Sequence, residues 1–174
     1  MALARREVLA IGAVALASAA AGLVLGPRLR QLSPDRALLQ TVFTDLRGHP
    51  RRLEEWRGQA VVCNFWATWC APCREEIPLL VAAREKFAAK GMEIVGIAID
   101  NPMKVTEFAA TFKISYPILQ AEAQGLELMR RLGNDAGGLP YTVVADRQGK
   151  LAYRKLGALK QPELEATLSR LVQG

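Results

Sequence analysis

The sequence predicts an α/β fold in which helices cover a mixed β-sheet. Apolar, β-branched runs at 60–65 and 92–99 predict buried strands, and each is followed by apolar residues at helical spacing. Two further runs, at 141–146 and 151–156, flank turn residues at 147–150 and indicate a hairpin. Strands that are first separated by helices and then joined by a hairpin make a sheet with both parallel and antiparallel pairs.

Weaker patterns predict the remaining elements. Residues 39–45 alternate loosely between apolar and polar side chains, which indicates a strand, and 53–56 indicate a helical turn. A helix is expected to follow the cysteine pair and to run to Lys90, with a kink at Pro78. The other predicted elements are helices at 104–112 and 126–132, a short strand at 116–119, and a last helix that opens at Gln161 and turns Leu164, Leu168 and Leu171 inward.

Length and composition fit one globular domain, which we expect to span 39–174, behind a short N-terminal extension. The chain has 174 residues, of which 51% are hydrophobic, and this is enough for a single core. Its formal net charge of +6 comes from basic residues that are scattered along the chain. The sequence contains neither a basic helix nor interleaved aromatic and basic residues, so it argues against a nucleic-acid partner.

Residues 1–30 are predicted to be an export signal or a membrane anchor rather than part of the fold. Two arginines precede an uncharged, Ala-rich stretch at 8–25, whose length is at the lower limit for a spanning helix. Small residues at 17–21 offer cleavage sites, and the arginine pair fits both an ordinary basic start and a twin-arginine signal. We expect the N-terminus to lie inside and residues 31–38 to form a tether.

A pair of cysteines, Cys70 and Cys73, lies where the strand at 60–65 gives way to the next helix. The first turn of a helix has unpaired N–H groups and a partial positive charge, so it stabilises a thiolate over a thiol. The pKa of a cysteine there falls from about 8.5 to roughly 3.5–7.5. We expect Cys70 to attack and Cys73, one turn further on, to resolve the mixed disulfide. Pro72 fits the start of a helix, where its missing N–H is not needed.

The motif around this pair is much longer than two cysteines. The stretch from Asn64 to Pro78 holds Trp66, Trp69 and the cysteine pair, and it resembles the active-site signature of the TlpA-like thiol–disulfide oxidoreductases, which include the ResA and DsbE (CcmG) types. The resemblance extends from about Leu39 to the C-terminus. It implies a thioredoxin-like fold with an N-terminal β-hairpin before the core and a central strand–helix insertion.

The resemblance also implies a proton carrier. Cytosolic thioredoxins have a buried aspartate where this chain has Asn64. An asparagine side chain cannot titrate, so Asn64 cannot take over that role. The family's replacement is a glutamate three residues after the second cysteine, and Glu76 matches it. Residues three apart share one face of a helix, so Glu76 is expected to lie near Cys73 on the inward side. Burial would raise its pKa and make it a usable acid–base group near neutrality.

A substrate-binding surface is implied in the same way. In thioredoxin-like proteins a proline before a strand is cis and faces the dithiol, and Pro140 matches it. The backbone of Leu139 is then expected to pair with an incoming extended peptide. Many family members carry a small or hydroxyl residue where this chain has the bulkier Leu139. Trp69 and Pro72, which flank the cysteines, complete the predicted substrate-binding residues.

The function that the resemblance implies is reduction of disulfides in exported proteins, such as apocytochrome c during cytochrome c maturation. The expected partners are a disulfide-containing client protein and a membrane electron donor of the DsbD/CcdA type. We expect no cofactor and no metal. The location expected is the bacterial periplasm, with the domain either anchored through its N-terminal segment or released after cleavage.

Other functions stay open at this point. The same fold also serves as an oxidant or isomerase, and the direction of electron flow does not follow from sequence. Two cysteines are half of a metal site, so a metal chaperone is a second class. A peroxidase of the peroxiredoxin type is a third, although that chemistry uses a lone peroxidatic cysteine. Cys63, the third cysteine, is interpreted as a buried core residue in the strand at 60–65, with a reactive thiol as the alternative.

Overall fold

The computed structural model of the chain describes residues 33–173. The predicted export segment at 1–30 lies outside them. Contacts divide the chain into two units, Met1–Ser33 and Pro34–Gly174, and every element named below belongs to the second unit.

A mixed sheet is the framework of this unit. Its strands are β1 (Phe43–Asp45), β2 (Pro50–Arg51), β3 (Ala60–Trp66), β4 (Met92–Ala98), β5 (Ile118–Gln120), β6 (Tyr141–Ala145) and β7 (Leu151–Leu156). They form a seven-stranded sheet in the order β2-β1-β5-β4-β3-β6-β7. The pairs β3–β4 and β4–β5 are parallel and the remaining pairs are antiparallel, which confirms the predicted α/β class.

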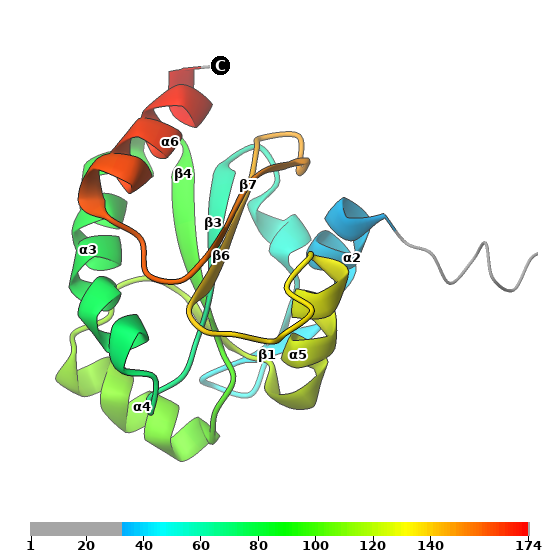
Figure 1. Cartoon of the computed structure of the whole chain (residues 1–174), viewed down its shortest axis with the longest axis vertical. Coiled ribbons are helices and arrows are strands. Elements are labelled where there is room, and N and C mark those ends of the chain that lie inside the picture. Colours follow the sequence, from blue (N-terminus) through cyan, green and yellow to red (C-terminus); the bar gives the residue numbers. More distant parts are fainter. Residues whose placement is uncertain (1–32, 174) are drawn as a thin grey trace, which may run out of the picture. The chain divides into compact units, whose positions relative to one another are not determined.

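Helices cover both faces of the sheet, as Figure 1 shows. They are α2 (Pro34–Gln40), η1 (Leu53–Trp56), α3 (Ala71–Phe87), η2 (Ala88–Lys90), α4 (Pro102–Thr111), α5 (Glu122–Arg131) and α6 (Gln161–Gln173). Helices α3, α4 and α6 pack on one face around a core that includes Ile77, Val105 and Leu168. Helices α2 and α5 pack on the other face, around Leu38 and Met129.

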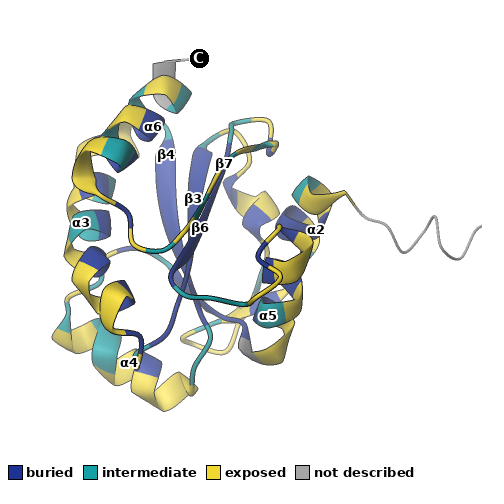
Figure 2. Cartoon of the chain, in the orientation of Figure 1, coloured by how far each residue is buried: buried dark blue, intermediate teal, exposed yellow. Residues whose placement is uncertain are grey.

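The central strands carry most of the core. All seven residues of β3 and all seven of β4 are buried, and these strands are dark blue in Figure 2. A strand that is covered on both faces needs apolar residues at nearly every position, and this explains the continuous apolar runs. Side chains still alternate between the faces, so Val62 and Trp66 join the core beneath α3 while Cys63 and Phe65 join the core beneath α5.

Two features implied by the resemblance are present. Strands β1 and β2 pair antiparallel and form the N-terminal hairpin before the core. The segment β4–α4–β5 is the strand–helix–strand insertion, and it adds β5 in parallel beside β4. The predicted helical turn at 53–56 is η1.

The predicted tether at 31–38 overlaps a packed helix, which corrects that expectation. Helix α2 begins at Pro34, and its Leu38 and Leu39 are buried in the core beneath α5. The carboxylate of Asp35 accepts a hydrogen bond of 3.0 Å from the N–H of Leu151 on β7. The strand predicted at 39–45 therefore begins only at Phe43. Apolar residues here serve a docked helix rather than a strand.

Helix α5 also begins earlier than predicted, at Glu122 rather than at Leu126. Gly125 weakens the helical pattern in this turn, because glycine is a poor helix former. Its small size is needed for packing, since a Cβ at this position would lie 2.7 Å from the Cβ of Ala121. The long helix predicted after the cysteines ends as α3 at Phe87 and is followed by a 3-10 turn to Lys90.

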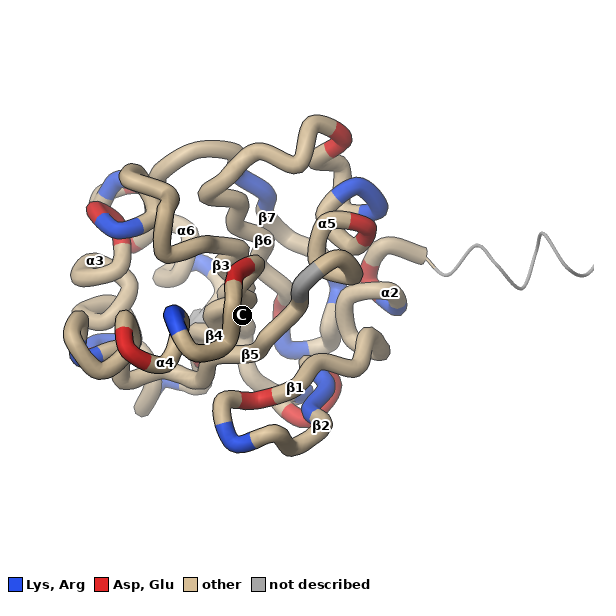
Figure 3. Tube along the Cα trace, turned by 90° about the horizontal axis from the view of Figure 1, so that it is seen from below, with Lys and Arg blue, Asp and Glu red and all other residues tan. Residues whose placement is uncertain are grey.

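Charged residues are distributed over many elements of this unit. Figure 3 shows basic and acidic positions interspersed along the trace, with both signs on α3 and α5. Among the described residues, none of the helices is both long and apolar enough to cross a membrane.

Candidate active site

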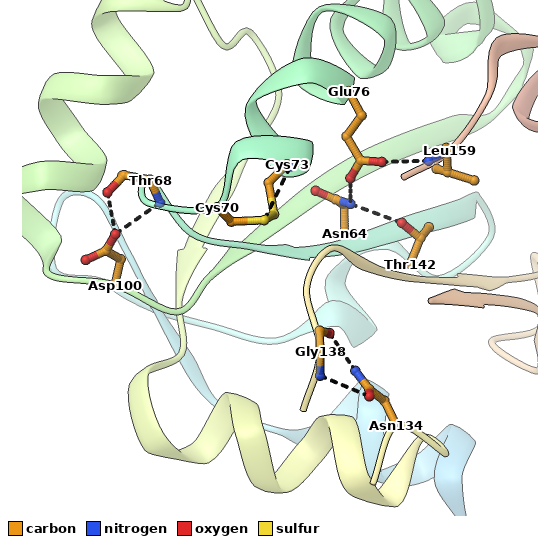
Figure 4. Close-up of a disulfide and its surroundings, with 10 residues drawn as sticks. All are labelled: Asn64, Thr68, Cys70, Cys73, Glu76, Asp100, Asn134, Gly138, Thr142 and Leu159. Carbon is orange, nitrogen blue, oxygen red and sulfur yellow. Dashed lines mark hydrogen bonds between the residues drawn. A yellow bond between two sulfur atoms is a disulfide. The ribbon is translucent and has the colours of Figure 1, made fainter. Parts of the chain in front are cut away.

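The cysteine pair lies at the junction between β3 and α3, as predicted. Cys70 is the residue before the helix, and Cys73 lies in its first turn. The two sulfurs form a disulfide, with 5.3 Å between the Cα atoms. The N–H of Cys73 also donates a hydrogen bond of 3.3 Å to the Cys70 sulfur (Figure 4). A thiolate on Cys70 would thus meet the unpaired N–H groups of the helix start.

Exposure distinguishes the two sulfurs. Cys70 is 5% exposed, whereas Cys73 is completely buried. Only Cys70 therefore offers an approach from outside. Its neighbours are more open, since Trp69 is 69% exposed and Pro72 is also exposed. A large exposed aromatic side chain on the residue before Cys70 provides a surface against which another protein can pack.

The loop that carries Cys70 is tied to the end of the neighbouring strand. The N–H and the hydroxyl of Thr68 both donate hydrogen bonds to the carboxylate of Asp100, which follows β4 (Figure 4). Burial favours the neutral acid, but these bonds and one from the N–H of Asn101 outweigh it and lower the pKa of Asp100. The ionised carboxylate holds the loop in place between β3 and α3.

Pro140 lies at the same edge of the sheet as the cysteine pair. The Leu139–Pro140 peptide bond is cis. Tyr141, the first residue of β6, pairs with Phe65 near the end of β3, so Pro140 lies beside the strand end that leads to Cys70. Pro140 is buried and Leu139 is half-buried. The structure thus brings these two residues to the dithiol edge predicted for them.

A neighbouring asparagine fixes the approach to this proline. The side-chain amide of Asn134 donates a 2.8 Å hydrogen bond to the carbonyl of Gly138 and accepts one of 3.2 Å from its N–H (Figure 4). These paired bonds hold the backbone one residue before Leu139. In the sequence Asn134 lies just after the helix predicted at 126–132.

Glu76 is buried one helical turn after Cys73, with 3% of its surface exposed. One carboxylate oxygen accepts a 2.7 Å hydrogen bond from the side-chain amide of Asn64, and the other accepts one of 2.8 Å from the N–H of Leu159 (Figure 4). The same amide nitrogen of Asn64 donates a 3.0 Å bond to the hydroxyl of Thr142. Both cysteine and glutamate are on the inward side of α3, as predicted.

Burial raises the pKa of Glu76, and the hydrogen bonds from Leu159 and Asn64 act in the opposite direction. The net direction is upward from the ordinary value of 4.5. A carboxyl with a raised pKa accepts and releases protons closer to neutrality. Glu76 can therefore exchange a proton within the core, on the side of the helix that holds Cys73.

Four residues of this region were not predicted as site residues, namely Asp100, Asn134, Thr142 and Leu159. Asp100 directly follows a buried strand, and Thr142 is a polar residue within the apolar run at 141–146. Both are signals that the sequence offers. Leu159 acts through its backbone N–H, so its side chain gives no sign of the contact.

Cys63 is separate from the redox pair. It is completely buried, and it packs on the opposite face of the sheet from Cys70 and Cys73. Burial raises the pKa of its thiol, which favours the unreactive protonated form. The interpretation of Cys63 as a core residue agrees with this placement.

In the part of the chain that the structure describes, no group of three or more His, Cys, Asp or Glu residues is arranged to hold a metal ion.

The AhpC/TSA family matches residues 33–162, which is most of the chain. The chain belongs to the AhpC/TSA family. Among curated relatives, the thiol-disulfide oxidoreductase ResA of Geobacillus kaustophilus is 32% identical over 132 residues, which cover 75% of this chain and 73% of the relative. The resemblance to ResA-type proteins is thereby confirmed.

Solved structures of related proteins have the same fold. A secreted thiol-disulfide isomerase from Corynebacterium glutamicum matches with a TM-score of 0.72 and 26% identity, covering 79% of this chain and 86% of the other. A thiol:disulfide interchange protein of the thioredoxin family from Chlorobium tepidum matches with a TM-score of 0.67 and 29% identity, covering 77% and 94%. The protein is a thiol–disulfide oxidoreductase with a thioredoxin-like fold.

Proposed function

We propose that this oxidoreductase reduces disulfides in exported proteins, with Cys70 as the attacking sulfur. The observation that carries the proposal is the unequal exposure of the two sulfurs at the start of α3, where Cys70 is 5% exposed and Cys73 is buried. A helix start favours the thiolate, and the thiolate is the nucleophile in disulfide exchange.

The reaction proceeds in two exchanges. The Cys70 thiolate attacks one sulfur of the client disulfide, so a mixed disulfide forms and the other client sulfur leaves as a thiolate. Cys73 then gives its proton to the Glu76 carboxylate and attacks the Cys70 sulfur. The second client sulfur leaves, and the Cys70–Cys73 disulfide remains. Two electrons have passed to the client, whose thiolates take up protons from solvent.

The surface around the dithiol would bind the client as an extended peptide. Trp69 and Pro72 offer exposed apolar contacts beside Cys70. Pro140 has no N–H, and the backbone of Leu139 is held next to it by the bonds of Asn134 to Gly138. We expect this backbone to hydrogen-bond with an extended strand of the client.

We place this reaction outside the cytoplasm, with the domain either anchored through residues 1–30 or released from them. An exported reductase loses electrons at each turnover and needs a donor in the membrane, for which the DsbD/CcdA type is our candidate. Apocytochrome c before haem attachment is our candidate client. The support is the Arg-led apolar segment at 1–30 and the similarity to a ResA protein and to a secreted relative.

Two cysteine variants test the roles of the sulfurs on a peptide that is disulfide-linked to glutathione. Cys70→Ser should abolish its reduction, and Cys73→Ser should stop at a covalent adduct with the peptide that mass spectrometry detects. Cys63→Ala is the matched control and should keep full activity. Reduction that persists in Cys70→Ser would refute the assignment.

The redox midpoint of the Cys70–Cys73 pair tests the direction of electron flow. A midpoint near −270 mV, about that of thioredoxin, would support a reductant with a membrane donor, whereas one near about −120 mV would make the protein an oxidant. The other classes are tested on the same sample. Stoichiometric binding of Cu(I) or zinc would favour a metal chaperone, and rapid turnover of peroxide would favour a peroxidase.

A further inference from the structure

A cross-strand pair of polar side chains, Asn64 and Thr142, lies next to Glu76. Asn64 on β3 and Thr142 on β6 are opposite each other in the antiparallel ladder, so their side chains share one face of the sheet. Both residues are completely buried. The amide nitrogen of Asn64 donates to Glu76 at 2.7 Å and to Thr142 at 3.0 Å, so one side chain joins the other two (Figure 4).

We propose that Asn64 and Thr142 are positioning residues for proton transfer, and that the Asn64 amide turns over when Glu76 changes between carboxylate and carboxylic acid. The inference deepens the proposed function, because it rests on Glu76 as the proton acceptor for Cys73.

The hydrogen bonds of Glu76 distinguish its ionised form from its protonated form. In the arrangement of Figure 4 both of its oxygens accept bonds from N–H groups, which suits an ionised carboxylate. A carboxylic acid carries an O–H on one oxygen, and that group needs an acceptor. One Glu76 oxygen is bonded to the main-chain N–H of Leu159, which can only donate and so cannot accept a bond from an O–H. The proton therefore belongs on the oxygen that faces Asn64.

Asn64 has the acceptor that the protonated form needs. Its amide oxygen is buried, and it has no hydrogen-bond partner among the described residues. A half-turn of the amide exchanges its nitrogen and oxygen, since the two ends have nearly the same shape. The oxygen then faces Glu76 and accepts the O–H bond. This turn keeps Glu76 paired in both of its protonation states. The Asn64 N–H groups then lie where its oxygen has no hydrogen-bond partner, so the cost of the protonated form falls on Asn64.

Thr142 can follow the change because a hydroxyl both donates and accepts. It accepts from the Asn64 nitrogen when Glu76 is ionised. It donates to the Asn64 oxygen when Glu76 is protonated, after its hydrogen rotates. A valine has the same shape but does neither. Tyr116, before β5, is an ionisable group close enough to interact with Glu76, whose charge adds to burial in raising the pKa of the Tyr116 hydroxyl. Cys73, one turn earlier on α3, is bonded to Cys70 and does not titrate in the disulfide form.

Thr142→Val gives the first test. Without the hydroxyl, one N–H of Asn64 is left unpaired when Glu76 is ionised, whereas the turned amide oxygen still accepts from protonated Glu76. Unpaired N–H groups are the more costly of the two. We expect the ratio of ionised to protonated Glu76 at a given pH to fall by about three- to tenfold, because the variant loses a hydrogen bond in both forms and only the extra cost of the unpaired N–H in the ionised form changes the ratio. The readout is the carboxyl ¹³C signal of Glu76 in the disulfide form.

Two matched variants separate this role from packing. Thr142→Ser keeps the hydroxyl and should restore the wild-type titration, even if it lowers stability. Thr167→Val removes a buried hydroxyl on α6 and should leave the Glu76 titration unchanged. A wild-type titration in Thr142→Val, or a failure of Thr142→Ser to restore it, would overturn the role of Thr142.

The turn of the amide has its own signature. In the wild type the side-chain ¹⁵N–¹H signals of Asn64 should change with the same midpoint as the Glu76 carboxyl, and in Glu76→Gln they should not depend on pH. Asn64 signals that stay constant through the Glu76 titration would rule out the turn. This outcome is distinct from failure of the proposed function, which would appear as activity retained in Cys70→Ser.

Discussion

Replacing Glu76 with glutamine is expected to change how the stability of the fold depends on pH. Burial raises the pKa of Glu76 above 4.5 despite the hydrogen bonds from Leu159 and Asn64, so the folded protein holds this proton more tightly than the unfolded chain does. The stability that protonation contributes is complete below pH 4.5 and is lost as the pH rises through the folded-state pKa.

The size of the effect follows from this linkage. Between the unfolded and folded pKa values, the wild type should lose at most about 1.4 kcal/mol of unfolding free energy per pH unit through Glu76. Glu76→Gln imitates the protonated acid, because it has a donor for a turned Asn64 and an acceptor for Leu159, and it should lose none of this free energy. The unfolding free energy of the variant should therefore rise relative to that of the wild type as the pH rises. This relative gain ends once Glu76 is ionised in both the folded and the unfolded wild type.

Urea unfolding of the disulfide form at a series of pH values measures the difference in free energy between wild type and variant. Glu75→Gln is the matched control, since it makes the same change one residue earlier on an exposed side chain. If the difference in unfolding free energy between Glu76→Gln and wild type stays constant with pH, the reasoning is refuted. The folded and the unfolded protein would then hold the Glu76 proton equally tightly.

Three further changes have expected outcomes. In the reduced protein, iodoacetamide should label Cys70 but neither Cys63 nor Cys73 until urea unfolds the chain, which mass spectrometry of peptides would show, because both of the latter are completely buried; rapid labelling of Cys63 in the folded state would contradict its burial. Gly96→Ala should lower the unfolding free energy by about 1–3 kcal/mol through overpacking, since its Cβ would lie 2.9 Å from a ring nitrogen of Trp66; an unchanged urea midpoint would argue against this close contact. Pro78→Ala, on the exposed side of α3, should raise the melting temperature, because alanine has the N–H that the proline lacks and can donate a hydrogen bond within the helix. The change should add about 1 kcal/mol or more to the unfolding free energy. A lower melting temperature would mean that the proline is needed for packing.

The sequence predicts the central strands and the dithiol junction well, because both depend on local patterns. The apolar runs at 60–65 and 92–99 match β3 (Ala60–Trp66) and β4 (Met92–Ala98) within one residue, since burial on both faces leaves a continuous signal. Helix α2 is missed because it is short and its packing depends on distant residues. Its Leu39, for example, lies against Gly149, where a Cβ would be only 2.6 Å from the leucine.

The same limit applies to the site. The positions of Cys70 and Cys73 follow from a strand that gives way to a helix, and the inward direction of Glu76 follows from helical spacing. The partners of Glu76 do not follow from either. Thr142 is joined to Glu76 through Asn64, which it meets only because of the register of β6 against β3. Leu159 reaches Glu76 only through the path of the chain into α6. Such contacts are decided by the tertiary fold.

The opposite-face placement of Cys63 bears on how the correct pair of sulfurs is chosen during folding. Cys63 is seven positions before Cys70, close enough in the unfolded chain to compete for an oxidant. In the folded protein the sheet itself stands between them, because β3 presents Cys63 to one core and leads Cys70 to the other. A bridge between the two would require β3 to leave its ladders with β4 and β6. A Cys63–Cys70 disulfide is therefore incompatible with the native sheet, so the completed fold itself selects the Cys70–Cys73 pair.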